Sequence, residues 1–256
     1  MIEDRPVKVG CCGFPTRQHE YLHEFGVVEL QSTFYQLPQL DTAEHWRTQA
    51  PPRFEFCVKA WQIITHPATS PTWKHMSTAN LPRRASRCGH LKPTRENLDA
   101  WERTLEICRI LRTRVCLIQC PASYGFSKRN VENARRFFGQ IDRGGMRIAW
   151  EPRGNWKEHQ DVIKELCQRV DIIHAVDILR SKPAMDTDTC YFRLHGLGPR
   201  EFNYRYRYSI EDLGRLKDAA TACLARGAQE IYVLFNNMNM LEDARTLCSI
   251  MHTSGM

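Results

Sequence analysis

The chain has 256 residues, of which 42% are hydrophobic and 25% charged, proportions typical of a globular protein with a sizeable core. No apolar stretch approaches the roughly 20 residues of a membrane-spanning helix, which excludes an integral helical membrane protein. The formal net charge of +7 permits anionic partners, nucleic acid among them, without requiring any.

The N-terminus and the cysteines bear on location and metal binding. Residues 1–6 lack the basic start and apolar run of a signal peptide, so we expect a cytoplasmic protein that has no membrane partner. The chain has 11 cysteines. No two of them have CxxC spacing, and an isolated Cys88–Gly89–His90 does not specify a zinc site. We expect reduced cysteines that serve as small buried side chains.

Short apolar segments alternate with helical patterns along the chain. The predicted strands are residues 7–12, 27–31, 54–59, 115–119, 147–151, 172–177, 191–195 and 231–235. The clearest predicted helices are residues 95–111, 130–140, 157–169, 210–226 and 241–251. Ser209, three residues before Asp212, is expected to cap the fourth of these helices, and Gly227 to end it.

Strand–helix alternation repeated eight times predicts an α/β protein, a single (β/α)₈ TIM-type barrel domain over residues 1–256. The connections after the third and seventh strands, residues 60–93 and 196–208, are too long for simple βα loops. The first carries a basic cluster, and the second interleaves arginines with aromatic residues such as Tyr204. Both are expected at the carboxyl ends of the strands, as lids or as a stacking platform for bases.

Alternation within the strands predicts which side chains point into the barrel. Val28 and Leu30 form the apolar face of the second strand, which leaves Glu29 and Gln31 on the inner face. The same rule, applied near the carboxyl end of every strand, predicts a ring of inward polar side chains. Its members are Glu29, Lys59, Gln119, Glu151, Arg153, Asp177, Arg193, His195 and Asn237. Buried charges are costly unless they are paired or used. The ring is therefore either a functional site or a self-neutralising network that braces the barrel, for example through Glu29 with Lys59 and Glu151 with Arg153 or Arg193.

Three cations of the ring suit a phosphate or carboxylate ligand. Lys59, Arg153 and Arg193 are expected to bind such an anion, since arginine offers two parallel hydrogen bonds to it. The other predicted substrate contacts are His66, Gln119, Asp177, Asn237 and Tyr204.

The ring also offers proton transfer. His195 with Glu29 and Glu151 is the predicted catalytic set, because histidine titrates near neutral pH and carboxylates can be tuned upward. Alternatively Glu29, Glu151, Asp177 and His195 would ligate a divalent metal. The neighbouring cations would repel a metal ion and no GxGxxG fingerprint is present, so no cofactor is predicted.

Six ordered motifs carry a family resemblance. They are residues 28–35 (VELQSTFY), 56–66 (FCVK…ITH), 119–124 (QCPASY), 151–156 (EPRGNW), 191–196 (YFRLHG) and 235–237 (FNN). In this order they resemble the YecE-like family, domain of unknown function 72, with Gln31 where the family usually has asparagine. The resemblance implies a TIM-type barrel and no particular activity.

These observations favour an enzyme, a hydrolase or an isomerase, that acts on a small or terminal anionic, phosphorylated substrate. The alternatives are a metal-dependent phosphodiesterase that processes nucleic acid and a non-catalytic module that binds a small anion. The sequence does not fix the oligomeric state.

Overall fold

The computed structural model describes residues 6–77 and 81–252, so residues 1–5, on which the signal-peptide expectation partly rests, lie outside the described residues. All eight predicted strands are present. They are β1 (Val7–Cys12), β2 (Val27–Leu30), β3 (Glu55–Lys59), β4 (Val115–Gln119), β5 (Arg147–Glu151), β6 (Ile173–His174), β7 (Thr189–Leu194) and β8 (Glu230–Phe235). They form one sheet in the order β6-β5-β4-β3-β2-β1-β8-β7. The predicted (β/α)₈ TIM-barrel fold class is confirmed.

The five predicted helices are also present. The helices are α1 (Gln18–Glu24), α2 (Ser32–Tyr35), α3 (Leu40–Gln49), α4 (Arg95–Leu111), α5 (Lys128–Gln140), α6 (Gln160–Val170), α7 (Ile210–Ala225) and α8 (Met240–His252). The sequence did not single out α1, α2 and α3. The first two are only 7 and 4 residues long, and Ala43 is the one buried residue of α3. Among the described helices none is long and apolar enough to cross a membrane.

The expected alternation of strands and helices fails after β6. Residues 175–188, all of them described, contain no helix, and β6 has 2 residues instead of the predicted span 172–177. Pairing with β7 continues beyond the short strand as an isolated bridge between Val176 and Phe192. The chain then turns at Asp177, whose backbone carbonyl accepts from the amides of Arg180 and Ser181, both at 2.9 Å.

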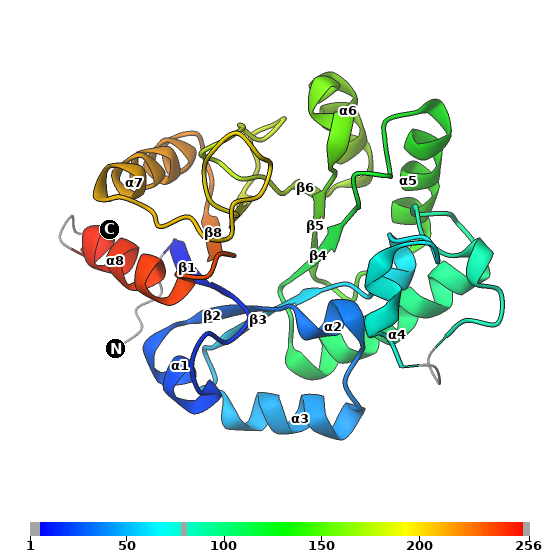
Figure 1. Ribbon diagram of the computed structural model, residues 1–256, viewed down its shortest axis with the longest axis horizontal. Coiled ribbons are helices and arrows are strands. Elements are labelled where there is room, and N and C mark those ends of the chain that lie inside the picture. The colour runs from blue at the N-terminus through cyan, green and yellow to red at the C-terminus, as the bar shows by residue number, and fades with distance from the viewer. Residues whose placement is uncertain (1–5, 78–80, 253–256) are drawn as a thin grey trace. The chain divides into compact units, whose positions relative to one another are not determined.

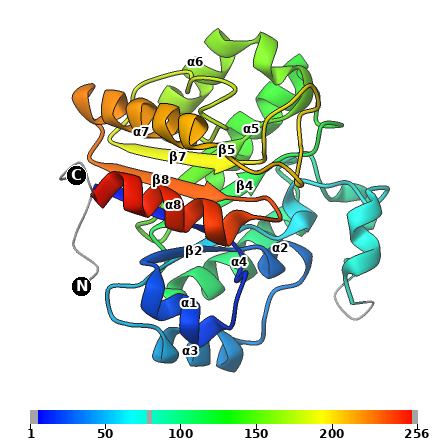
Figure 2. The same cartoon turned by 60° about the vertical axis from the view of Figure 1, so that its left-hand side comes forward.

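The chain groups into two compact units. Unit 1 contains the described residues of Met1–Glu29, Ala50–Glu55 and Ile173–Met256, and unit 2 contains those of Leu30–Gln49 and Phe56–Ile172. In unit 1, β8 pairs in parallel with β1 and β7. Helix α8 packs against β1 and against α7 (Figure 1), and β7 and β8 run side by side in Figure 2.

Two local expectations hold in unit 1. The Ser209 hydroxyl accepts from the Asp212 amide at 3.1 Å, and the Asp212 carboxylate accepts from the Ser209 amide at 3.0 Å, which forms a capping box on α7. Gly227, with a φ of +100°, follows the helix end.

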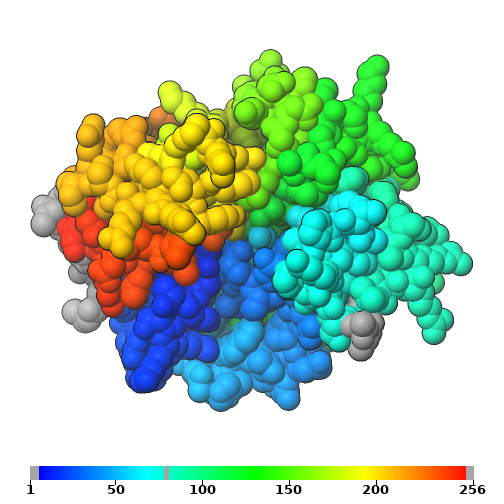
Figure 3. Space-filling model, viewed as in Figure 1, coloured from blue at the N-terminus to red at the C-terminus, as the bar shows by residue number. Residues whose placement is uncertain are grey.

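In unit 2, β4 pairs in parallel with β3 and β5. The long connection after β3 begins with a 3₁₀ turn, Gln62–Ile64, against which its later part folds back: the amides of Gly89 and Leu91 donate to the carbonyls of Ile63 and Ile64 at 2.8 and 3.1 Å. This connection lies at the surface, where it is cyan in Figure 3.

The fully buried Asn97 of α4 holds the same connection in place. Its amide nitrogen donates to the carbonyls of Ile64, Gly89 and Lys92, and its amide oxygen accepts from the Gly89 amide. The connection is therefore anchored to the helix that follows it.

All eleven cysteines are free thiols, and ten of them are buried. Their burial confirms the expectation that they serve as small buried side chains. Burial and the nearby Glu29 carboxylate raise the pKa of Cys12 well above its usual value, so its thiol stays protonated.

Candidate functional site

The carboxyl ends of three neighbouring strands in unit 2 collect polar side chains. Lys59, Gln119 and Glu151 are the last residues of β3, β4 and β5. Gln119 pairs in register with Glu151, and Lys59 with Leu117, two residues before Gln119. Each of the three side chains is buried. The inward alternation predicted from the sequence therefore brings these three groups to adjacent strand ends.

Arg153 is tied to the end of β5. Its Nε and Nη2 atoms donate to Oε1 of Glu151 at 2.7 and 2.6 Å. This is one of the two pairings considered for Glu151 from the sequence. The ion pair fixes the guanidinium two residues beyond the strand.

The Lys59 side chain lies against the segment that follows β2. Its ammonium donates to Oε1 of Gln31 at 3.3 Å and lies 4.2 Å from the centre of the Phe34 ring, a cation–π contact. The Thr33 hydroxyl donates to the Lys59 carbonyl at 2.7 Å. The sequence motif around Thr33 and Phe34 thus orients Lys59.

His66 is a buried histidine held next to this lysine. Its Nδ1 lies 2.8 Å from the Thr65 hydroxyl, and its ring packs edge-on against Phe34 at 4.8 Å. Within the described part of the chain, its Nε2 has no hydrogen-bond partner. Burial, together with the charges of Lys59 and Arg153, lowers the pKa of His66 from 6.5 to about 3. His66 is therefore neutral near pH 7.

His90 is a second histidine of this region, and the sequence did not identify it as a site residue. Its Nε2 is buried without a hydrogen-bond partner among the described residues. Burial lowers its pKa, and Lys92 and Arg129 add to the effect. Its charge also lowers the pKa of His66, so the two rings interact electrostatically. The sequence could have indicated His90 as a site residue only through its position in the same long connection as His66.

Acid is expected to destabilise the protein through His66. An unfolded chain binds a proton on this histidine as pH falls through about 6.5, whereas the folded protein does so only near pH 3, so stability is full above pH 6.5 and is lost below it. Between pH 7 and 5 this loss amounts to about 2 kcal/mol from His66 alone. Urea unfolding at both pH values should show this pH-dependent loss in the parent protein. In His66→Gln, which cannot titrate, the loss should be smaller by that amount; an equal loss in both proteins would contradict a depressed pKa.

In unit 1 the most buried ion pair joins Glu29 and Arg193. The Nε and Nη2 atoms of Arg193 both donate to the Glu29 carboxylate at 2.9 Å, and Tyr191 donates to it at 2.8 Å. Both charged residues are 0% exposed. The guanidinium therefore binds Glu29 and presents no surface to solvent. The substrate-binding role predicted for Arg193 stays a prediction.

His195 is fixed as a neutral tautomer by the same arginine. Its Nδ1 lies 3.1 Å from the Arg193 carbonyl, which only accepts, so Nδ1 carries the proton. Its Nε2 lies 3.3 Å from Nη1 of Arg193, which only donates, so Nε2 is the acceptor. Both ring nitrogens are thus engaged, and the ring packs edge-on against Phe202 at 5.2 Å.

The remaining predicted contacts also lie in unit 1. Asp177 accepts from the His195 amide at 3.2 Å. Asn237 donates to Asp243 at 2.6 Å, and its buried amide oxygen has no partner among the described residues. Tyr204 is 47% exposed, and its ring centre lies 6.4 Å from that of His195.

No metal-binding cluster appears in the part of the chain that the structure describes. There, no three His, Cys, Asp or Glu side chains are grouped so that they could hold a metal ion. Glu29, one of the ligands considered from the sequence, has both oxygens bound to Arg193. The metal site considered from the sequence, which combines residues of both units, stays a prediction.

Comparisons with known proteins agree with this fold. Residues 14–255 match the family described as protein of unknown function DUF72. A DUF72 family protein from Thermotoga maritima MSB8 is 24% identical, covers 97% of this chain and 100% of that chain, and has a TM-score of 0.69. A xylose isomerase domain containing protein from Salmonella typhimurium LT2 is 13% identical, with 100% and 98% covered and a TM-score of 0.58. An AP endonuclease, family 2, from Brucella melitensis is 13% identical, with 90% and 93% covered and a TM-score of 0.53. No curated protein matches the chain.

At these identities the solved structures establish the fold alone. The family match, in contrast, extends over residues 14–255 and includes all six motifs noted in the sequence. The chain belongs to the DUF72 family of proteins of unknown function.

Proposed function

We propose that the chain is an enzyme that acts on a small phosphorylated substrate at the carboxyl ends of β3, β4 and β5. The observation that carries this proposal is the convergence of Lys59, Gln119 and Glu151 on three adjacent strand ends, next to Arg153. In TIM barrels the carboxyl ends of the strands are where substrates bind.

The charge balance of this group supports an anionic ligand. Lys59 and Arg153 place two cationic groups at these strand ends, beside the Glu151 carboxylate and the neutral His66. A phosphate group is attracted by two such cations. Arg153 would contact it through a guanidinium fork and Lys59 as a point charge.

Proton transfer is assigned to Glu151. It is the one carboxylate among the predicted ring members of unit 2, and its side chain keeps 10% of its surface exposed. Glu151 would act as general acid or base in a hydrolysis or an isomerisation, while Gln119 and the Nε2 atom of the neutral His66 offer hydrogen bonds to substrate oxygens. His66 Nε2 can serve in this way because no protein group occupies it within the described residues.

In unit 1 we assign Glu29 and His195 a positioning role. Glu29 is fully buried and both of its oxygens bind Arg193, so a substrate proton would not reach it without displacing the arginine. His195 accepts from the same guanidinium. We therefore assign Glu29 and His195 to holding Arg193 in place, instead of the proton transfer predicted for them from the sequence.

The names of the solved structures that share this fold are relevant to the class of reaction. They include a xylose isomerase domain and an endonuclease, so this fold accommodates both of the reaction types considered. The substrate of this chain follows from its own side chains and not from theirs.

Titration calorimetry with inorganic phosphate and glucose 6-phosphate tests the proposed anion site. Lys59→Met and Arg153→Gln are each expected to weaken binding about tenfold or more, because each removes a charged hydrogen bond. Lys164→Met, an exposed lysine of α6 in the same unit, is the matched control and should bind as the parent protein does. Equal affinities in all four proteins would refute an anion site at these strand ends.

A further inference from the structure

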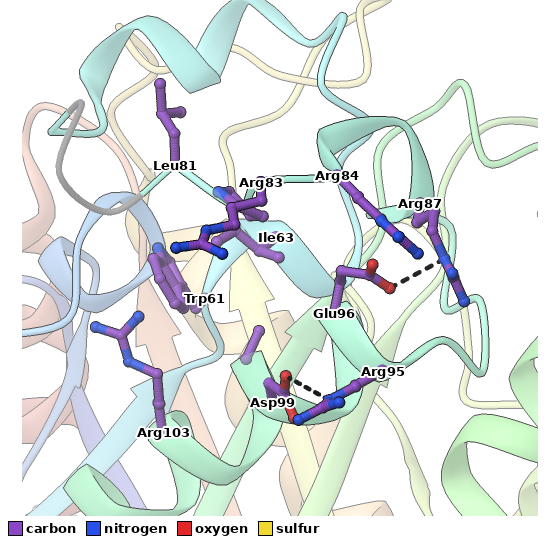
Figure 4. A pocket seen from close by; sticks show the side chains of 12 residues that line it. Trp61, Ile63, Leu81, Arg83, Arg84, Arg87, Arg95, Glu96, Asp99 and Arg103 are labelled. Carbon is purple, nitrogen blue, oxygen red and sulfur yellow. Dashed lines mark ion pairs between the residues drawn. The ribbon is translucent and has the colours of Figure 1, made fainter.

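Unit 2 contains a pocket that is separate from the residues of the proposed site. It has a volume of about 680 Å³, within the roughly 300–1,000 Å³ usual for small-molecule sites. It lies between the connection after β3 and the start of α4. Its lining residues come from these two segments and from the turn that follows β3 (Figure 4).

Arginines dominate the charge of this pocket. Arg83, Arg84, Arg87, Arg95 and Arg103 line it, against only two carboxylates, which leaves a formal excess of three positive charges. This excess makes the electrostatic potential of the pocket positive, which attracts anions.

The two carboxylates are already used by two of the arginines. Arg87 pairs with Glu96 at 3.1 Å, and Arg95 pairs with Asp99 at 3.6 Å. These pairs hold the two arginines along α4 and account for both acids of the pocket (Figure 4).

The other three arginines, Arg83, Arg84 and Arg103, have no carboxylate partner among the described residues, and all three are exposed. Arg103 lies 4.6 Å from the ring of the buried Trp61. In the view of Figure 4, Arg83 lies above this indole and Arg103 below it. The Arg103 guanidinium is thus placed against this indole ring.

The pocket also has an apolar wall, whose accessible part is Leu81, 45% exposed, and the half-buried Pro82; Trp61, Ile63 and Ala100 also line it but are only 1–3% exposed. A ligand that matches this lining carries several negative charges at one end and a flat apolar ring at the other.

We propose that this pocket binds a nucleoside diphosphate or triphosphate, with its phosphates on Arg83, Arg84 and Arg103 and its base against the apolar wall. Arginine forks suit phosphate oxygens in pairs. The three unpaired guanidinium groups match the charge of a diphosphate, and the volume suits one nucleotide. Asn97, which fastens the connection to α4, holds the pocket wall in shape before the ligand arrives.

Titration calorimetry with ADP, adenosine and inorganic pyrophosphate tests the proposal on the full chain. ADP is expected to bind more tightly than pyrophosphate, and adenosine at least tenfold more weakly than ADP. Arg83→Gln and Arg103→Gln should each weaken ADP binding about tenfold. Arg136→Gln on α5 removes the same charge from an exposed arginine outside the pocket and should leave ADP affinity within twofold.

Two further measurements separate this pocket from its alternatives. Lys59→Met, which is expected to weaken anion binding at the ends of β3–β5, should leave ADP affinity unchanged; a loss of ADP binding there would overturn the assignment to this pocket. Single-stranded RNA that binds far more tightly than ADP and is lost in Arg83→Gln would identify a strand-binding surface instead. No ADP binding, or equal ADP affinity in the Arg83→Gln/Arg103→Gln protein, would also overturn the proposal.

Discussion

Replacing Arg193 by methionine is expected to lower the free energy of unfolding by about 3–5 kcal/mol, the usual cost of leaving one charge of a buried pair without its partner. Glu29 and Arg193 are both 0% exposed and joined by three N–H···O contacts of 2.9 to 3.2 Å. Without the guanidinium, the Glu29 carboxylate keeps the Tyr191 hydroxyl among its donors but loses the Arg193 charge. Urea unfolding followed by far-UV circular dichroism measures the loss.

The matched control is an exposed ion pair of the same unit. Arg245 pairs with Glu24 at 2.5 Å, with side chains 44% and 34% exposed. Arg245→Met should cost no more than about 1 kcal/mol, because solvent screens such pairs. The double variant Glu29→Gln/Arg193→Met should be more stable than the sum of its single variants implies. If Arg193→Met costs no more than Arg245→Met does, the buried pair does not brace unit 1.

Glu151→Gln is expected to reduce turnover by about 10²–10⁴-fold, the usual contribution of a general acid or base. The amide cannot exchange a proton, yet it keeps the size of the side chain and an oxygen that accepts from Arg153. Because the amide oxygen still accepts from Arg153, the free energy of unfolding should fall by less than in Arg193→Met.

Phosphorus and proton NMR in D₂O measures this turnover on a panel of sugar phosphates and p-nitrophenyl phosphate. Hydrolysis releases inorganic phosphate, whereas isomerisation yields a new sugar phosphate that carries deuterium. Glu165→Gln, an exposed carboxylate of α6, is the control and should keep full turnover. Parent-like rates in Glu151→Gln would remove Glu151 from the mechanism.

Much of the framework could be predicted because strand alternation is a local property. Phe192 and Leu194 on one face of β7, against Tyr191 and Arg193 on the other, suffice to place the polar face inward. The bounds of β4 and β5 follow from uninterrupted apolar runs between polar turns. The short helices α1 and α2 give no such signal, because fewer than two full turns leave no periodicity to read.

The partners within the site could not be predicted in the same way. Alternation places Glu29 and Arg193 on inner faces, but they are 164 residues apart, and which cation reaches which carboxylate depends on register and rotamers. From the sequence we expect Lys59 to form an ion pair with Glu29, and an anionic ligand to bind Arg193. The structure shows Arg193 bound to Glu29, and therefore leaves anion binding to Lys59 and Arg153 of unit 2 as the stronger proposal.

The most direct test of the anion site at the ends of β3–β5 is NMR of the His66 ring as a function of pH, with and without inorganic phosphate. Without phosphate, the His66 signals should not titrate between pH 8 and 5, because burial and the nearby cations keep its pKa near 3. Phosphate bound beside Lys59 and Arg153 should shift these signals at pH 7 and raise the pKa of His66, and Lys59→Met should weaken that response. A His66 that titrates near pH 6.5 and does not respond to phosphate would contradict the account.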